Sequence, residues 1–165
     1  MSTNMYLKIE GIDGESSAEG HDKEIEILSW SHGFSQPTSS VRASSGATVE
    51  KANHSDISVT KYLDSASDDL IKRLWTGKQI KTATITCFRA DGADDNAPVQ
   101  YLTVELSEVI VSNYSISGGM GDLPVENISF NYGLIKYTYK PQKKDDGTAG
   151  EQQAISYDLN KNKIS

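Results

Sequence analysis

The sequence of 165 residues contains a single cysteine, Cys87, so no disulfide can form within the chain. Cys87 stands in the run KTATITCFRA, residues 81–90, in which Ala83, Ile85 and Cys87 alternate with threonines. Such alternation is typical of a β-strand with one buried face, where cysteine packs as a small apolar residue. We therefore expect Cys87 to be buried and not to act as a nucleophile.

The chain also lacks a long apolar run and a surplus of basic residues. No segment offers the roughly 20 apolar residues of a membrane-spanning helix, and the first residues, MSTNMYLKIEG, show no signal-peptide pattern. The 16 Lys and Arg residues are outnumbered by 23 Asp and Glu, giving a formal net charge of −7, which disfavours nucleic acid and anionic membranes as partners. We expect a protein made in the cytosol, without membrane insertion, and if it leaves the cell we expect it to do so without a cleaved signal peptide.

Sequence features of catalytic, cofactor or metal sites are equally scarce. His54, Ser55 and Asp56 are consecutive, but neighbours on a strand point to opposite faces, so they cannot form a catalytic triad. The motif GGMGD lacks the helix that a dinucleotide-binding motif requires, and DGADDN lacks calcium-loop ligands. No short ligand spacing connects the histidines, and a meeting of His32 with His54 across paired strands is the one metal alternative. We predict no enzyme activity, no catalytic residues, no cofactor and no metal.

Length and hydrophobic periodicity predict one mainly β domain over residues 1–165. Short alternating runs separated by Gly, Asp and Ser recur along the chain. Two long runs change phase, near Ser107 and Glu108 in VQYLTVELSEVIVSNYSIS and after Gly133 in VENISFNYGLIKYTYKP. A bulge at these points would bend each run, and bent antiparallel strands are what a curled sheet needs in order to close. We therefore predict a closed antiparallel β-barrel.

One segment has the period of a helix instead. Leu70, Leu74 and Trp75 fall on one helical face, acidic residues precede them, and Gly77 stands where a left-handed residue ends a helix. We predict one short α-helix on the flank of the barrel, with Leu70, Leu74 and Trp75 as its buried packing anchors.

Two polar segments interrupt the strand pattern. Residues 35–48, SQPTSSVRASSGAT, form an extended connection whose length is typical of functional or disordered loops. The C-terminal tail, residues 143–165, is polar and contains one weak strand signal, AISYDL. We expect the tail to pack at a sheet edge or against a neighbouring molecule.

The stretches at 14–37, 60–78 and 126–142, the last together with 157–163, resemble the Hcp (haemolysin-coregulated protein) family of bacterial type VI secretion systems. GESSAEGHDKEIEILSWSHGFSQP at 14–37 is similar to the family's N-terminal signature, and TKYLDSASDDLIKRLWTGK at 60–78 to its strand and helix. ENISFNYGLIKYTYKPQ at 126–142, with YDLNKNK at 157–163, is similar to its final strand and tail. The resemblance covers nearly the whole chain in order, so it is more specific than any single motif.

This resemblance implies a β-barrel subunit that assembles into a hexameric ring around a wide lumen. In the family such rings stack into a tube, which a contractile sheath expels beneath a spike protein, and the lumen holds and protects toxic effectors. The expected partners are therefore copies of the chain itself, the spike protein, the sheath and effector proteins. The resemblance also implies secretion through the type VI system, a form of protein transport connected with virulence.

Several residues acquire candidate roles in such a tube. Four residues of the 35–48 loop are candidates for contacting the next ring: Gln36, Pro37, Val41 and Arg42. Ser31 follows Trp30 on a predicted strand, so its side chain opposes the tryptophan, and we expect it to face the lumen and its cargo.

Two other classes of protein stay open as alternatives. A monomeric β-sandwich carbohydrate-binding module would use Trp30, Trp75 and tyrosines as platforms, but both tryptophans fit better on core faces. A hydrolase would use the region of His54, but no separate nucleophile and base accompany it. We therefore favour a structural tube subunit.

Overall fold

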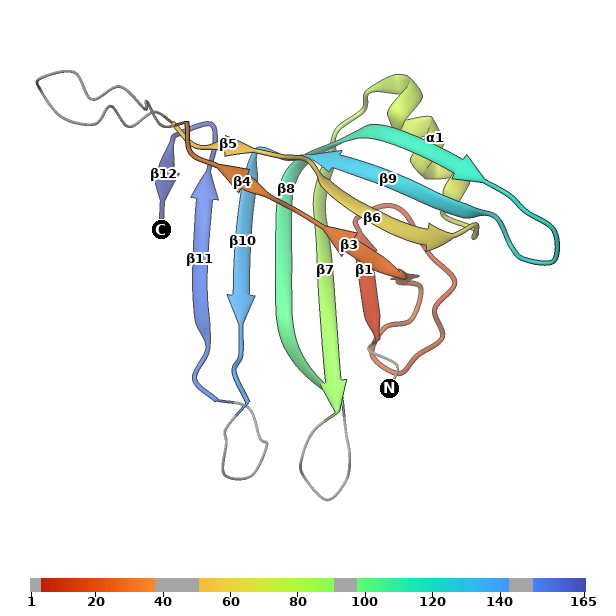
Figure 1. Ribbon diagram of the computed structural model, residues 1–165, viewed down its shortest axis with the longest axis horizontal. Helices are drawn as coiled ribbons and strands as arrows, with labels where there is room; N and C mark the ends of the chain where they lie inside the picture. Colours follow the sequence, from red (N-terminus) through yellow and green to blue (C-terminus); the bar gives the residue numbers. More distant parts are fainter. Residues whose placement is uncertain (1–3, 38–50, 91–97, 143–149) are drawn as a thin grey trace, which may run out of the picture.

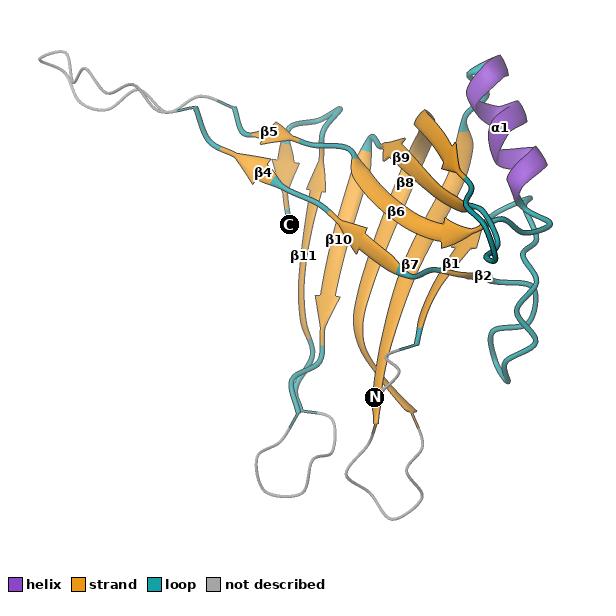
Figure 2. Cartoon of the chain, turned by 45° about the vertical axis from the view of Figure 1, so that its right-hand side comes forward, coloured by secondary structure: helices purple, strands orange, loops and turns teal. Residues whose placement is uncertain are grey.

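The computed structural model describes residues 4–37, 51–90, 98–142 and 150–165 (Figures 1 and 2). Within these residues one helix, α1 (Ser67–Thr76), accompanies twelve strands, and every strand pairing is antiparallel. The strands are β1 (Met5–Ile9), β2 (Ile25–Glu26), β3 (Ser29–Ser31), β4 (Phe34–Ser35), β5 (Asn53–His54), β6 (Ile57–Tyr62), β7 (Ile80–Ala90), β8 (Pro98–Ser117), β9 (Val125–Asn131), β10 (Leu134–Tyr139), β11 (Gln153–Asp158) and β12 (Lys163–Ile164). The predicted mainly β architecture with one short helix is confirmed.

The long strand β8 belongs to two sheets. Its first part pairs with β7 and β10 in a sheet of order β12-β11-β10-β8-β7-β1-β2. Its last part pairs with β9, and this second sheet continues through β6 to β3, which run across the long strands in Figure 1. The pairing with β10 ends at Ser107, Glu108 has a positive φ of 54°, and the pairing with β9 begins at Ile110. The bend predicted near Ser107 and Glu108 is therefore confirmed.

The second predicted break lies between β9 and β10. Tyr132 and Gly133 separate these two strands, so the chain leaves one sheet and enters the other there. The N–H of Gly133 donates to the carbonyl of Ser107 at 3.0 Å, and a Cβ on Gly133 would lie 2.4 Å from the Glu108 carboxylate. The two bends therefore sit side by side, and the close approach favours glycine at this position.

The strands of the described ranges do not close into a barrel, so the prediction of a closed barrel is wrong there. β2 pairs only with β1, and β3 pairs only with β6. Residues 25–31 instead pass from one sheet to the other. The Ile27 N–H donates to the Met5 carbonyl at 3.2 Å, and the Leu28 N–H donates to the Thr60 carbonyl at 2.7 Å. Phase changes in a sequence show where strands bend, but they carry no information on which distant edges meet.

One hydrophobic core lies between the two sheets. Leu7 on β1, Ile85 on β7 and Phe130 on β9 are all 1% exposed or less. Cys87 is 1% exposed, as predicted, and burial raises the pKa of its thiol. The alternation of buried and exposed residues on these strands therefore follows the sequence pattern from which they were predicted.

The helix α1 covers one end of the core (Figure 2). Leu70 is fully buried, Leu74 packs partly buried against the core, and Gly77 ends the helix with a φ of 66°. Trp75 is 80% exposed, so the prediction that it is a buried anchor is wrong. Successive helical residues are about 100° apart, and the face that carries Leu70 and Leu74 turns Trp75 outward. Within the described residues, no helix has both the length and the apolarity to cross a membrane.

Charged side chains are fully buried beneath the start of α1. Lys61 on β6 and Glu126 on β9 are both 0% exposed, and the Lys61 Nζ lies 2.5 Å from Glu126 Oε1. Lys61 also donates to Asp64 at 2.7 Å and to the Ser67 hydroxyl at 3.2 Å. Tyr114 on β8 donates to Glu126, and burial, followed by this hydrogen bond, raises the pKa of Tyr114. The cluster connects three strands with the first residue of α1.

Candidate functional site

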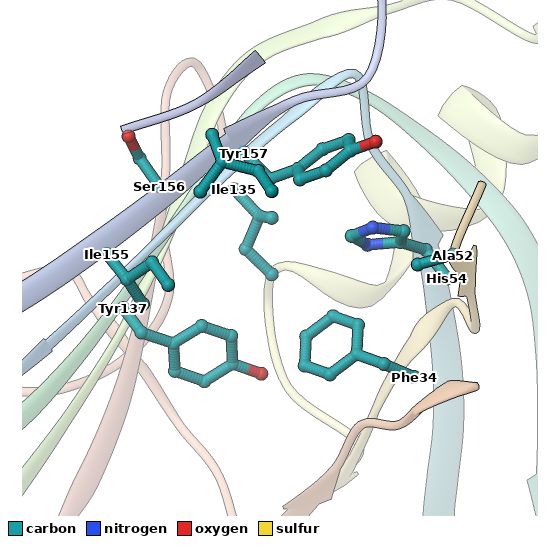
Figure 3. A pocket seen from close by; sticks show the side chains of 9 residues that line it. Phe34, Ala52, His54, Ile135, Tyr137, Ile155, Ser156 and Tyr157 are labelled. Atoms are coloured by element: carbon teal, nitrogen blue, oxygen red, sulfur yellow. The ribbon is translucent and has the colours of Figure 1, made fainter. Parts of the chain in front are cut away.

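An apolar groove lies where β4 and β5 face β10, β11 and β12 (Figure 3). Its volume is about 250 Å³, and the residues that line it are Phe34, Ala52, His54, Ile135, Tyr137, Ile155, Ser156, Tyr157 and Ile164. Three of them are large and exposed, with exposed fractions of 54% for Phe34, 58% for Ile155 and 66% for Ile164. Contiguous exposed apolar patches on a protein often mark a surface that binds another molecule.

The two walls of the groove come from distant parts of the sequence. β4 and β5 pair only with each other, with Phe34 opposite His54. The tail strand β11 adds to the edge of β10, which places Ile155 opposite Tyr137 and confirms that the tail packs at a sheet edge. The ring centroids of His54 and Tyr157 lie 4.8 Å apart, and Figure 3 shows both rings at the groove.

Two histidines and two tyrosines form a hydrogen-bonded cluster behind this groove. His32 Nε2 lies 2.7 Å from the Tyr132 hydroxyl and 3.1 Å from the Ser55 carbonyl, while His32 Nδ1 contacts the Tyr137 hydroxyl. His54 Nδ1 lies 2.9 Å from the same Tyr132 hydroxyl. Burial lowers the pKa of both histidines and raises the pKa of Tyr132 and, to about 12, that of Tyr137. The neutral forms of all four side chains are therefore favoured.

The structure brings His32 and His54 close together, but a ring nitrogen of each histidine is hydrogen-bonded to the Tyr132 hydroxyl and not directed at a shared metal position. No group of three or more His, Cys, Asp or Glu side chains in the described ranges could hold a metal ion. Sequence reasoning missed the two tyrosines. The sequence feature that could have indicated them is their position on either side of Gly133, where the chain passes from one sheet to the other.

The His54, Ser55 and Asp56 run is not arranged as a triad. The single strand expected through these residues is interrupted, because β5 ends at His54 and β6 begins at Ile57. His54 Nδ1 is directed at Tyr132, and the Asp56 carboxylate accepts from Ser112 at 2.5 Å and from Asn131 at 3.0 Å. Neither the base nor the acid is directed at Ser55.

A second exposed apolar surface lies where β6 ends and β9 begins. These strand ends lie across the molecule from β11 and β12 in Figure 1. Leu28, Tyr62, Leu63 and Leu123 are 40% to 62% exposed around a hollow of about 380 Å³. The carboxylates of Glu15, Glu26 and Asp64 also line this hollow. Its acidic rim distinguishes this surface from the groove, which no Asp or Glu lines.

The residues predicted to act in assembly lie in two places. Ser31 is exposed on β3, and the preceding Trp30 is half-buried against the core, so the two side chains oppose each other as expected. Gln36 is exposed and Pro37 half-buried just after β4. The other two candidates, Val41 and Arg42, lie outside the described residues.

Comparison with known proteins identifies the family. The family described as "Type VI secretion system effector, Hcp" matches residues 6–139. The chain belongs to the Hcp family. Protein hcp1 of Pseudomonas aeruginosa is 34% identical to it over 163 residues, which are 98% of each chain.

Solved structures of Hcp proteins share the fold over the full length. The structure of a type six secretion system protein superposes with a TM-score of 0.90 at 29% identity, covering 99% of this chain and 100% of the other. Hcp1 from Salmonella typhimurium gives a TM-score of 0.81 at 30% identity, with both chains covered completely. As an Hcp family member the protein is a structural component of the type VI secretion tube and not an enzyme. The carbohydrate-binding alternative is not supported.

Proposed function

We propose that six copies of this chain close into a ring and that the rings stack into the inner tube of a type VI secretion system. The tube assembles in the bacterial cytoplasm, a contractile sheath expels it beneath a spike protein, and effector proteins travel in its lumen. The full-length likeness to Hcp proteins supports this proposal. The chain itself would leave the cell through the tube that it builds.

The observation that carries the ring proposal is the pair of different apolar surfaces. A ring closes head to tail when one surface of a subunit fits a different surface of the next. The groove, with Ile155 and Ile164, and the hollow, with Leu28 and Leu123, lie on opposite sides in Figure 1. A dimer in which one surface contacts the same surface of a second copy would leave the other surface of both copies exposed.

Hydrophobic burial favours this contact. Charged residues seldom occupy the core of a protein interface, and the side chains around the groove are apolar or aromatic except for His54 and Ser156. A lysine in place of Ile155 would bring a charge into the contact. Even beside the carboxylates of the hollow, the cost of desolvating a buried charge can exceed the attraction that the ion pair gains.

The test is the native mass of three variants in sedimentation equilibrium. The unchanged chain should sediment at about 108 kDa, six times 18.0 kDa. Ile155→Lys and Leu123→Lys should each sediment mainly as the 18.0 kDa subunit, because they change the two opposite surfaces. Ala154→Lys is the matched control, since Ala154 is exposed on the same strand with its side chain on the opposite face. Equal masses for Ala154→Lys and Ile155→Lys would contradict the assignment of the groove.

Stacking and cargo binding use other residues in this proposal. Gln36, Pro37, Val41 and Arg42 contact the next ring, and Ser31 faces the lumen, where its small side chain leaves room for effectors. The exposure of Ser31 and Gln36 in the single chain is consistent with these roles.

A further inference from the structure

The pair β4 and β5 is attached to the rest of the protein mainly through side chains. Its two strands form a sheet of their own and join neither large sheet. The contacts that hold it include the cluster of His32, His54, Tyr132 and Tyr137. Phe34 also makes edge-to-face contacts with both histidine rings, at centroid distances of 4.5 and 4.9 Å. His32 lies just before β4 and His54 lies in β5. Both tyrosines come from the opposite side of this junction, Tyr132 from the chain between β9 and β10 and Tyr137 from β10 itself.

The hydrogen bonds of the cluster form one directed chain when both rings are neutral. The Ser55 carbonyl can only accept, so His32 Nε2 carries the ring proton, and His32 Nδ1 accepts from the Tyr137 hydroxyl. The Tyr132 hydroxyl accepts from His32 Nε2 and donates to His54 Nδ1. Every hydrogen-bond donor in the series Tyr137, His32 and Tyr132 then has an acceptor, and the last acceptor is His54.

A proton on His54 breaks this chain. Protonated His54 carries a proton on Nδ1, which must donate to the Tyr132 hydroxyl that already accepts from His32. The Tyr132 proton loses the acceptor that it had. When His32 is also protonated, two cationic rings flank one hydroxyl, and like charges at this separation repel each other.

We propose that the cluster of His32, His54, Tyr132 and Tyr137 is an acid-sensitive latch, which holds β4 and β5 against β10 and β11 at neutral pH and releases them on acidification.

The charged groups around the cluster do not compensate two cations. Asp56 favours a charge on His32, but one carboxylate cannot offset two cationic rings. Lys51 disfavours a charge on His54. From the facing strands the titratable groups are the hydroxyls of Tyr132, Tyr137 and Tyr157.

The direction of the pH effect follows from these shifts. Burial holds the pKa of both histidines below the ordinary value of 6.5, so the released form binds more protons than the latched form. The latch is therefore fully stable above about pH 6.5 and weakens as the pH falls below that value. Because Phe34 and His54 also line the groove, release would open one wall of the proposed subunit contact. That consequence rests on the proposed ring, whereas the latch does not.

Hydrogen exchange of the full chain at pH 7.5 and pH 5.5, corrected for the intrinsic rates, tests the latch. We expect protection of the amides in residues 53–56 to fall, by up to about tenfold for each histidine at one unit of pH below its unperturbed pKa. The amides of β7 should keep their protection. His54→Asn, which leaves an amide oxygen near the Nδ1 position, should remove most of this pH response, and Tyr132→Phe should lower protection at both pH values.

His21→Asn is the matched control, because His21 packs on Tyr6 and contacts Glu24 far from the cluster. It should leave the pH response of residues 53–56 unchanged. Equal protection of these residues at both pH values, or an unchanged response in His54→Asn combined with His32→Gln, would overturn the latch. Sedimentation at the same two pH values reports separately on the ring, so a failed ring and a failed latch give different results.

Discussion

Replacing Lys61 with methionine should destabilise the chain strongly, because the substitution leaves the Glu126 carboxylate buried without its cation. Both side chains are 0% exposed, and their charged atoms lie 2.5 Å apart. Removing one partner of a buried ion pair costs about 3–5 kcal/mol. Glu126 keeps the Ser67 hydroxyl at 2.8 Å and the Tyr114 hydroxyl as donors, which places the expected loss near the lower limit.

The expected loss is therefore about 3 kcal/mol, or roughly 6–12 °C in Tm for a domain of this size. The double variant Lys61→Met with Glu126→Gln removes both charges and keeps an oxygen acceptor for Ser67 and Tyr114. Its loss should be smaller than the sum of the two single losses by at least about 1 kcal/mol, since the pair interacts directly.

Urea unfolding followed by far-UV circular dichroism measures these free energies of unfolding. The variants are made in the Ile155→Lys background at one protein concentration, so that subunit association does not add to stability. Lys72→Met on the exposed face of α1 is the control and should change stability by no more than about 0.5 kcal/mol. A loss below about 1 kcal/mol for Lys61→Met, or strict additivity in the double variant, would refute the reasoning.

Three further predictions follow from single features of the chain. Ser31→Trp should reduce co-purification of an effector with the rings while the native mass stays unchanged, and full retention would show that cargo is held elsewhere. Deleting residues 38–46 should leave rings intact and reduce tube length in electron micrographs, and tubes of normal length would reject a stacking role for the loop. Gly14→Ala should lower the free energy of unfolding by about 1–3 kcal/mol, because its Cβ would lie 2.4 Å from the Glu24 carbonyl oxygen. Gly119→Ala, with no atom within 4 Å of the new Cβ, should have almost no effect in the same urea experiment.

Local patterns in the sequence predicted the local features of the fold. Side chains on a strand alternate with a period of two, so the phase changes at Glu108 and Gly133 located the bends directly. The same alternation predicted the burial of Cys87, and Gly77 marked the end of α1 because few other residues adopt a φ of 66°.

Long-range features were not available from such patterns. The contact between His32 and Tyr137 joins residues 105 positions apart, and that between His32 and Tyr132 joins residues 100 apart. Strand parity says which face a side chain takes but not which strand it meets. The burial of Trp75 was predicted wrongly for a related reason. The apolar residues of a helix can cover a wider face than the sheet contacts, and Trp75 lies outside that contact. The groove itself was visible only in the structure.

The most direct test of the ring proposal is electron microscopy of the purified, unmodified protein at high concentration. Class averages should show annular particles with sixfold symmetry and an open centre, together with short stacks of such rings. A field that contains only single 18.0 kDa particles, with no annular class at any concentration, would contradict the proposed assembly.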